Sequence, residues 1–148
     1  MALIKAIQEK IDTIATDHAP HLKQEKIKPY FNAPSGVPSI QHFYPAIFQI
    51  FRNNKIDFNL IPLLYLHNPA RIFNIKNRGF LTPGYWADIA IIEPTFEKKT
   101  KIMHKTRWSI FEDQDINYRV FATIINGQVA WLNSKIYETK SQKIEFNN

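Results

Sequence analysis

The sequence contains no cysteine. This absence excludes a disulfide framework and any metal site built on thiolates, and it fits a reducing compartment. A metal bound to this chain would therefore take its ligands from histidine, aspartate and glutamate, which suit hard and borderline cations.

Long apolar runs are missing as well. No stretch approaches the roughly 20 apolar residues of a membrane-spanning helix. Residues 1–10, MALIKAIQEK, interrupt their apolar positions with lysine and glutamate, unlike a secretory signal. We therefore expect a cytoplasmic protein without a membrane partner. The 45% of hydrophobic residues among 148 positions is sufficient for a packed core.

Basic residues outnumber acidic ones, and the formal net charge is +6. The excess is densest at residues 97–107, EKKTKIMHKTR. Aromatic side chains are not interleaved with these lysines as a stacking platform requires, and no known nucleic-acid module is present. We expect a solvated loop and no nucleic-acid partner. Salt-dependent retention on DNA would test the alternative of a basic nucleic-acid binder.

The first half of the chain mixes helical and extended patterns. Apolar residues at helical spacing predict an amphipathic helix over residues 2–10. The run TIAT, residues 13–16, predicts a short parallel strand buried on both faces. A later helix has Pro45 in its first turn, where proline is tolerated. Two further short helices are predicted with a break at His67, Asn68 serving as N-cap of the second.

After residue 75 the pattern becomes that of a β-sheet. Residues 88–93 predict a strand, and YRVFATIINGQVAWLN predicts a hairpin that turns at Asn126-Gly127. The last dozen residues are polar, and we expect them to be frayed. The order of elements therefore predicts an α/β unit followed by part of an all-β unit.

Polar side chains gather directly after the predicted buried strand. The stretch IDTIATDHAPH, residues 11–21, ends an apolar run at Asp17 and continues with His18, Pro20 and His21. In a (β/α)-barrel, catalytic side chains project from the C-terminal ends of the strands. Aspartate also often caps the turn after a strand. Position alone leaves both interpretations open.

The stretch TDHAPHLKQEK, residues 16–26, resembles the signature of the dihydroorotases, cyclic-amide hydrolases of pyrimidine biosynthesis in the amidohydrolase superfamily. The aspartate motif with its terminal histidine is the specific element, since the related hydantoinases and allantoinases usually lack that histidine. Weaker motifs similar to those of the family follow in order along nearly the whole chain: APSG at 33–36, NPA at 68–70, PGYWAD at 83–88, WSIFED at 108–113 and INGQV at 125–129.

The resemblance implies the reversible cyclisation of N-carbamoyl-L-aspartate to dihydroorotate at a site with two zinc ions. Asp17 would coordinate zinc and act first as general base and then as general acid. His21 would contact the substrate carboxylate, and backbone groups of Ser35 and Gly36 would face the pyrimidine ring. Without the resemblance, an ordinary turn would be the preferred interpretation of residues 33–36. His18 falls on no ligand position of the family and receives no role.

Most zinc ligands of the family have no counterpart here. The family carries a His-x-His pair, and no two of the five histidines in this chain are two residues apart. A (β/α)8 barrel takes about 250 residues, whereas this chain supplies one recognisable barrel strand. The expected fold class is therefore α/β, a C-terminal fragment of a (β/α)8 metal-dependent hydrolase barrel with part of a small β-sandwich. The expected boundaries are 1–78 for the barrel piece, 79–133 for the sandwich part and 134–148 for a polar tail.

Two functions are compatible with such a fragment. As a dihydroorotase portion it would need the missing N-terminal part, and alone it would bind zinc weakly and be inactive. As a non-catalytic remnant it could be a structural partner of aspartate carbamoyltransferase. The intact Asp17, His21 and residues 33–36 favour the enzymatic interpretation, because decay would not have spared these positions in particular. Exposed strand edges would make the isolated chain oligomeric or prone to aggregation.

Overall fold

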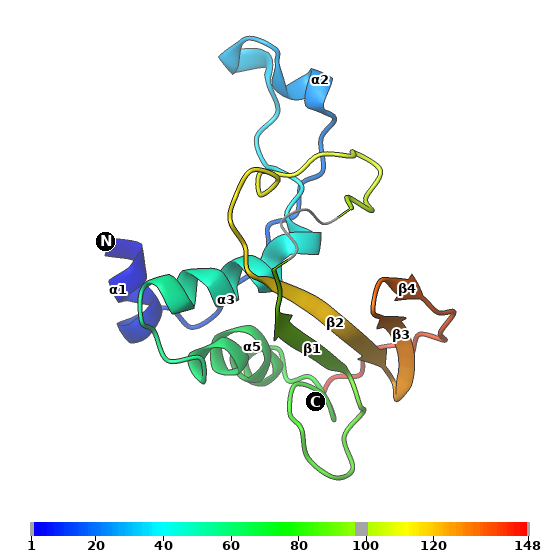
Figure 1. Ribbon diagram of the computed structural model, residues 1–148. Coiled ribbons are helices and arrows are strands. Elements are labelled where there is room, and N and C mark those ends of the chain that lie inside the picture. The colour runs from blue at the N-terminus through cyan, green and yellow to red at the C-terminus, as the bar shows by residue number, and fades with distance from the viewer. Residues whose placement is uncertain (1, 97–100, 148) are drawn as a thin grey trace.

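The helices occupy the first half of the chain and the strands the second, in a computed structural model that describes residues 2–96 and 101–147 (Figure 1). This confirms the predicted change from helical to β structure near residue 75. The helical elements are α1 (Ala2–Glu9), α2 (Lys23–Lys26), η1 (Tyr30–Asn32), η2 (Ile40–His42), α3 (Phe43–Asn53), α4 (Leu60–Pro62), η3 (Leu63–His67) and α5 (Asn68–Ile72). The strands are β1 (Ile89–Pro94), β2 (Tyr118–Ile125), β3 (Gln128–Leu132) and β4 (Lys135–Ile136).

The four strands form one sheet in the order β1-β2-β3-β4, with every neighbouring pair antiparallel. The hairpin predicted at Asn126-Gly127 is confirmed: Ile125 pairs with Gln128 across the turn. Asn126 has φ of 51° and Gly127 has φ of 78°. Both central residues of a two-residue turn of this hand need positive φ, and asparagine followed by glycine meets that need at low steric cost.

The core lies between α1, α3 and the helical stretch that begins at α4. Its buried centre consists of Phe51 with Ile56 and Ile61, and Ile4 and Ile7 of α1 pack against it. The predicted amphipathic helix over 2–10 is thus confirmed, with its apolar side turned to this centre. On its other side α3 contacts β2, as seen where the helix crosses the strand in Figure 1.

The predicted strand over residues 13–16 is wrong for this chain. The segment is extended, but Thr13 and Ala15 are exposed. Ile14 donates its backbone N–H to the carbonyl oxygen of Leu64 at 3.1 Å, and no strand pairs with the segment among the described residues. A parallel strand needs at least one neighbouring strand to pair with, and burial of both its faces needs packing layers on either side. Without them the backbone stays extended and its side chains stay partly open to water.

The predicted helix break at His67 is also wrong. From Leu60 to Ile72 the backbone remains helical, because residues 63–67 widen into a π-helical turn between α4 and α5. Asn68 has a helical φ of −65° and is not an N-cap. Proline lacks an N–H, and its ring clashes with the carbonyl group four residues earlier in a regular α-helix. We interpret the wider π turn just before Pro69 as the accommodation of that proline.

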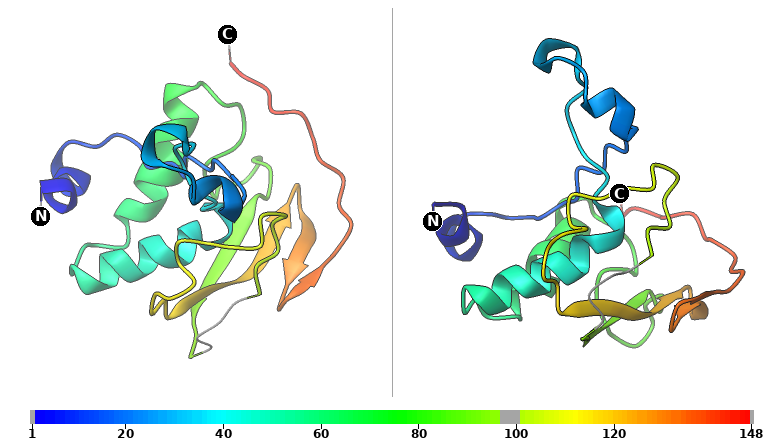
Figure 2. Two further views of the ribbon diagram at one scale, coloured as in Figure 1. Left: turned by 90° about the horizontal axis from the view of Figure 1, so that it is seen from above. Right: turned by 45° about the horizontal axis from the view of Figure 1, so that its top comes forward.

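The C-terminal tail returns to the helices instead of fraying. Figure 2 shows it leaving β4 as a long extended segment. Lys76 donates its backbone N–H to the carbonyl oxygen of Glu145 at 2.8 Å, and Asn147 donates to that of Asn74 at 2.8 Å. The Lys76 ammonium lies 3.3 Å from the Glu145 carboxylate. The expectation of a frayed end is therefore wrong for residues 145–147.

Two further predictions from the sequence concern a membrane-spanning helix and the basic run. Over the described ranges, no helix combines the length and the apolar character that crossing a bilayer would require. The basic run at 97–107 lies partly outside the described residues, and its part from 101 to 107 has no helix or strand.

Candidate functional site

The predicted site residues lie at the base of an arm, residues 19–37, which projects from the body of the chain and carries α2 and η1 (Figures 1 and 2). The two ends of the arm meet in an isolated parallel bridge between His18 and Val37. Ala19 donates its N–H to the carbonyl oxygen of Val37 at 3.1 Å. The bridge brings the segment that ends at Asp17 beside the residues that follow the APSG motif.

Asp17 is exposed and has a φ of 43°. This left-handed conformation is uncommon outside glycine, although aspartate tolerates it better than most residues. No described group forms a hydrogen bond or ion pair with the Asp17 carboxylate. The hydroxyl of Thr16 instead accepts the nearby backbone N–H of His18 at 3.3 Å. The alternative that Asp17 caps the turn after the segment is therefore wrong, and no described group occupies its carboxylate.

The APSG motif, residues 33–36, is held from one side by a lysine. The Lys26 ammonium donates to the carbonyl oxygens of Pro34 at 2.5 Å and of Gly36 at 2.9 Å. Ser35 is exposed. No described group accepts a hydrogen bond from the backbone N–H of Ser35 or Gly36. The motif therefore presents two backbone donors, while the carbonyl oxygens of Pro34 and Gly36 are occupied.

Gly36 is required at its position by both conformation and space. Its φ is 85°, and a Cβ added there would stand 2.4 Å from the Cβ of Ala19 on the opposite side of the arm. Replacing Gly36 with alanine is expected to lower the free energy of unfolding by roughly 1–3 kcal/mol, because left-handed strain and the clash act together. The change is to be measured by thermal or urea unfolding.

Gly84 offers a matched control for this prediction. Its φ is 87°, but an added Cβ would meet nothing within 4 Å. Gly84→Ala thus carries the strain without the clash, and it is expected to cost less than Gly36→Ala. Adding Ala19→Gly to Gly36→Ala should recover the part due to the clash. Equal losses in Gly36→Ala and Gly84→Ala would contradict the close approach.

His21 stands on the outgoing side of the arm with 38% of its side chain exposed. Its Nδ1 lies 3.9 Å from an Oε2 of Glu25, which also accepts the N–H of Leu22 at 2.7 Å. The carbonyl oxygen of His21 accepts a hydrogen bond from the indole Nε1–H of Trp108 at 2.9 Å. Trp108 therefore ties the connection between β1 and β2 to the arm. Sequence reasoning found Trp108 only as part of the WSIFED motif, without this contact.

Three other histidines line the region beneath the arm. The rings of His18 and His104 meet edge to face, with centroids 6.1 Å apart. His42 is buried, and its Nδ1 lies 3.1 Å from the hydroxyl oxygen of Ser109. Burial lowers the pKa of His42, and the neighbouring His104 lowers it further. Burial likewise lowers the pKa of His104, followed by the effect of His18. The lowered pKa values of His42 and His104 favour the neutral forms of these two side chains, which suits a packed structural role.

A complete metal centre is not assembled within residues 2–96 and 101–147, where no three His, Asp or Glu side chains come together as a metal ion requires. A catalytic zinc normally has three protein ligands. Asp17, exposed and unpaired, is suited to supply one of them. The described residues therefore do not fit a whole zinc site.

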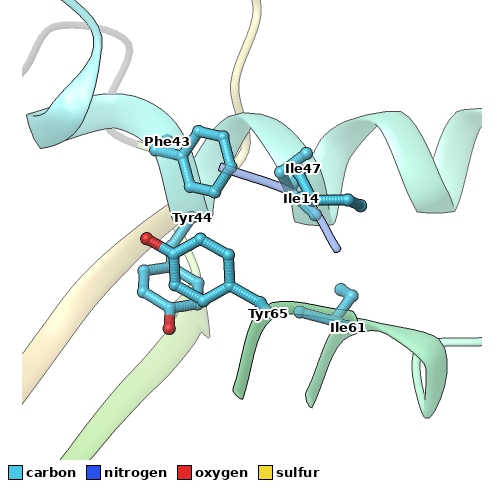
Figure 3. A pocket seen from close by; sticks show the side chains of 6 residues that line it. All are labelled: Ile14, Phe43, Tyr44, Ile47, Ile61 and Tyr65. Atoms are coloured by element: carbon cyan, nitrogen blue, oxygen red, sulfur yellow. The ribbon is translucent and has the colours of Figure 1, made fainter. Parts of the chain in front are cut away.

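An apolar pocket lies between the extended segment and the helices (Figure 3). It is lined by Ile14, Phe43, Tyr44, Ile47, Ile61 and Tyr65. The rings of Tyr44 and Tyr65 meet edge to face at 4.5 Å between centroids. Burial raises the pKa of Tyr44 well above its usual value, with a further contribution from Tyr65. No charged group lines the pocket. It contains none of the predicted site residues and belongs to the packing of Ile14.

Comparison of the sequence with known proteins finds dihydroorotases. The chain is 31% identical over 141 residues to a dihydroorotase of Methanosarcina acetivorans, covering 91% of this chain and 30% of that protein. It is 34% identical over 129 residues to one of Endomicrobium trichonymphae, covering 82% of this chain and 30% of that protein. The chain thus spans about 30% of the length of the curated relatives it matches. No protein-family model matches it.

Comparison of the fold finds hydantoinases. The chain superposes on an L-hydantoinase (dihydropyrimidinase) from Arthrobacter aurescens with a TM-score of 0.84 at 18% identity, covering 96% of this chain and 34% of that one. A D-hydantoinase from Thermus sp. gives a TM-score of 0.81 at 21% identity, covering 94% and 32%. The predicted fold class, an α/β fragment of such a hydrolase, is confirmed by these superpositions.

Proposed function

Because this chain is related in sequence to part of the dihydroorotases, within the amidohydrolase superfamily, we propose that it is the C-terminal portion of a dihydroorotase. The sequence match supports the proposal most directly, since it extends over 91% of the chain. The exposed, unpaired carboxylate of Asp17 at the base of the arm supports it chemically. The reaction is the interconversion of N-carbamoyl-L-aspartate and dihydroorotate.

Each predicted site residue has a role that its surroundings permit. In ring opening, water adds to a ring carbonyl carbon; the Asp17 carboxylate accepts the proton of that water and returns it to the departing ring nitrogen. His21 contacts the substrate carboxylate. The free N–H groups of Ser35 and Gly36 donate to polar atoms of the ring, which glycine at position 36 allows to come close.

The remaining groups of the site come from outside the chain. We propose zinc as the metal, with Asp17 as one ligand and the others on the part of a dihydroorotase that this chain does not match. The extended segment at residues 11–16 is the place where that part docks, because its backbone has unused hydrogen-bonding groups on its edges. An extended segment with free backbone groups of this kind can pair with a strand of another chain. Alone, the chain is inactive.

A chimera tests this proposal directly. The matched portion of the Methanosarcina acetivorans dihydroorotase is replaced by this chain, and formation of N-carbamoyl-L-aspartate from dihydroorotate is measured. We expect turnover by the chimera in the presence of zinc, and none by this chain alone or by the relative truncated before the junction. A folded, zinc-loaded chimera that leaves dihydroorotate intact would overturn the proposal.

A second candidate is a non-catalytic partner of aspartate carbamoyltransferase. It is favoured by one observation, that the described residues assemble no complete metal site. Under this alternative the chain binds aspartate carbamoyltransferase stably, and the chimera remains inactive although folded. Turnover by the chimera without any such complex would exclude it.

A further inference from the structure

We propose that His18 is a positioning residue, whose Nδ1 holds the returning end of the arm against the segment that carries Asp17. The inference rests on the proposed function only because it names Asp17 and the APSG motif as the site that His18 positions. The contact itself is a property of the chain and needs no substrate, metal or partner to be observed.

The geometry at His18 is that of one acceptor shared by two donors. The backbone N–H of Ser39 donates to Nδ1 at 3.0 Å, and the backbone N–H of Ile40 donates to the same atom at 3.2 Å. An imidazole nitrogen accepts only when it carries no proton, so the ring hydrogen is on Nε2. The two N–H groups belong to the start of η2, where the first donors of a helical turn have no partner within the turn.

Neighbouring contacts prevent the clamp from shifting. The hydroxyl of Ser39 donates to the carbonyl oxygen of Thr16 at 2.8 Å, directly before Asp17. Ser39 is only 6% exposed, so water competes little for these groups. The His104 ring packs edge to face against the His18 ring on another side. His18 is thus fixed on both sides while its Nδ1 points to the η2 amides.

The clamp determines where the APSG motif lies. Gly36 is followed by Val37, which bridges to His18, and shortly afterwards by the clamped Ser39. The Lys26 contacts hold the motif only to the arm itself, not to the body. Release of the η2 amides would leave the Val37 bridge and the Ser39 hydroxyl to hold this end of the arm, so we expect Ser35 and Gly36 to move more freely relative to Asp17. No other described side chain joins both ends of the arm through an acceptor of this kind.

Three substitutions distinguish the contribution of the Nδ1 acceptor from that of ring packing. His18→Asn keeps an acceptor at the same position, because the asparagine Oδ1 is bonded to Cγ as Nδ1 is in histidine. His18→Gln has the same amide chemistry but places its oxygen one bond further out. His18→Phe keeps a ring against His104 and has no acceptor. Amide hydrogen exchange and amide chemical shifts are measured by NMR on the full chain.

In His18→Asn we expect Ser39 and Ile40 to exchange as in the unchanged chain, with the Gly36 amide signal unmoved. In His18→Gln and His18→Phe we expect protection at Ser39 and Ile40 to fall about tenfold and the Gly36 signal to shift. Melting temperatures give a second readout, with His18→Asn expected above His18→Gln; a His18→Gln chain that does not fold, beside a folded His18→Asn chain, counts as the same result.

Retention of protection in His18→Phe would show that ring packing suffices and would overturn the proposal. So would equal losses in His18→Asn and His18→Gln. These measurements use no substrate, so an inactive chimera would count against the proposed function and leave the clamp standing. If the chimera is active and all three variants show normal amide exchange, the clamp is overturned and the proposed function stands.

Discussion

Replacing Asp17 with asparagine is expected to reduce dihydroorotate turnover by the chimera by roughly 10²- to 10⁴-fold, the usual contribution of a general acid–base group. Asparagine has the shape of aspartate but cannot accept and return a proton. It also tolerates the left-handed conformation that Asp17 adopts with a φ of 43°. The fold should therefore survive, and the loss should appear in kcat at unchanged stability.

Asp12→Asn is the matched control for this substitution. Asp12 is an exposed aspartate in the same extended segment, and its carboxylate has no part in the proposed chemistry. We expect the Asp12→Asn chimera to keep its turnover and its melting temperature. If the two variants lose activity to the same degree, the effect is one of overall charge, and Asp17 has no special role.

Replacing Phe51 with alanine is expected to lower the free energy of unfolding by about 3–5 kcal/mol. Phe51 has 0% of its surface exposed and packs with Ile56 and Ile61 at the centre of the core. The substitution removes buried ring surface and leaves a cavity. The backbone of α3 is fixed by its helical hydrogen bonds and cannot move in to close this cavity. Domains are stable by only about 5–15 kcal/mol, so this loss is a large share of the total, and urea unfolding should show a transition at a much lower urea concentration.

Ile50→Ala provides the comparison on the same helix. Ile50 precedes Phe51 in α3 and is 37% exposed, so its removal opens no enclosed cavity. We expect a loss well below that of Phe51→Ala, because only part of its surface is buried. Similar losses for both would mean that burial of Phe51 in the cluster adds no more stability than the partly exposed side chain of Ile50.

Most of the regular elements could be predicted from short patterns. The β2–β3 hairpin followed from Asn126-Gly127 between apolar runs, and α1 followed from helical spacing. Both depend on interactions between residues that are close in sequence. The strand at 13–16 was predicted by the same method and is wrong, because strand formation depends on a neighbour that may lie anywhere. No local pattern states whether that neighbour is present.

The residues of the candidate site could be proposed from the sequence, but the contacts that support them could not. Asp17, His21 and Gly36 are candidates because they belong to motifs that resemble those of a known family. The supports were missed, because His18 meets Ser39 across 21 residues and Trp108 meets His21 across 87. A histidine or tryptophan in a sequence carries no sign of the distant backbone group that it will contact.

By itself, the sequence determined the α/β-then-β order, the turn at Asn126-Gly127 and the aspartate motif, because helical periodicity, turn conformation and residue chemistry act within a few positions. Only the tertiary structure decided that residues 13–16 stay unpaired, that a π turn carries the helix through to Pro69, and that the tail returns to Lys76. It also decided that His18 clamps the arm. These features depend on which backbone groups find partners in space, and that matching is a property of the folded chain as a whole.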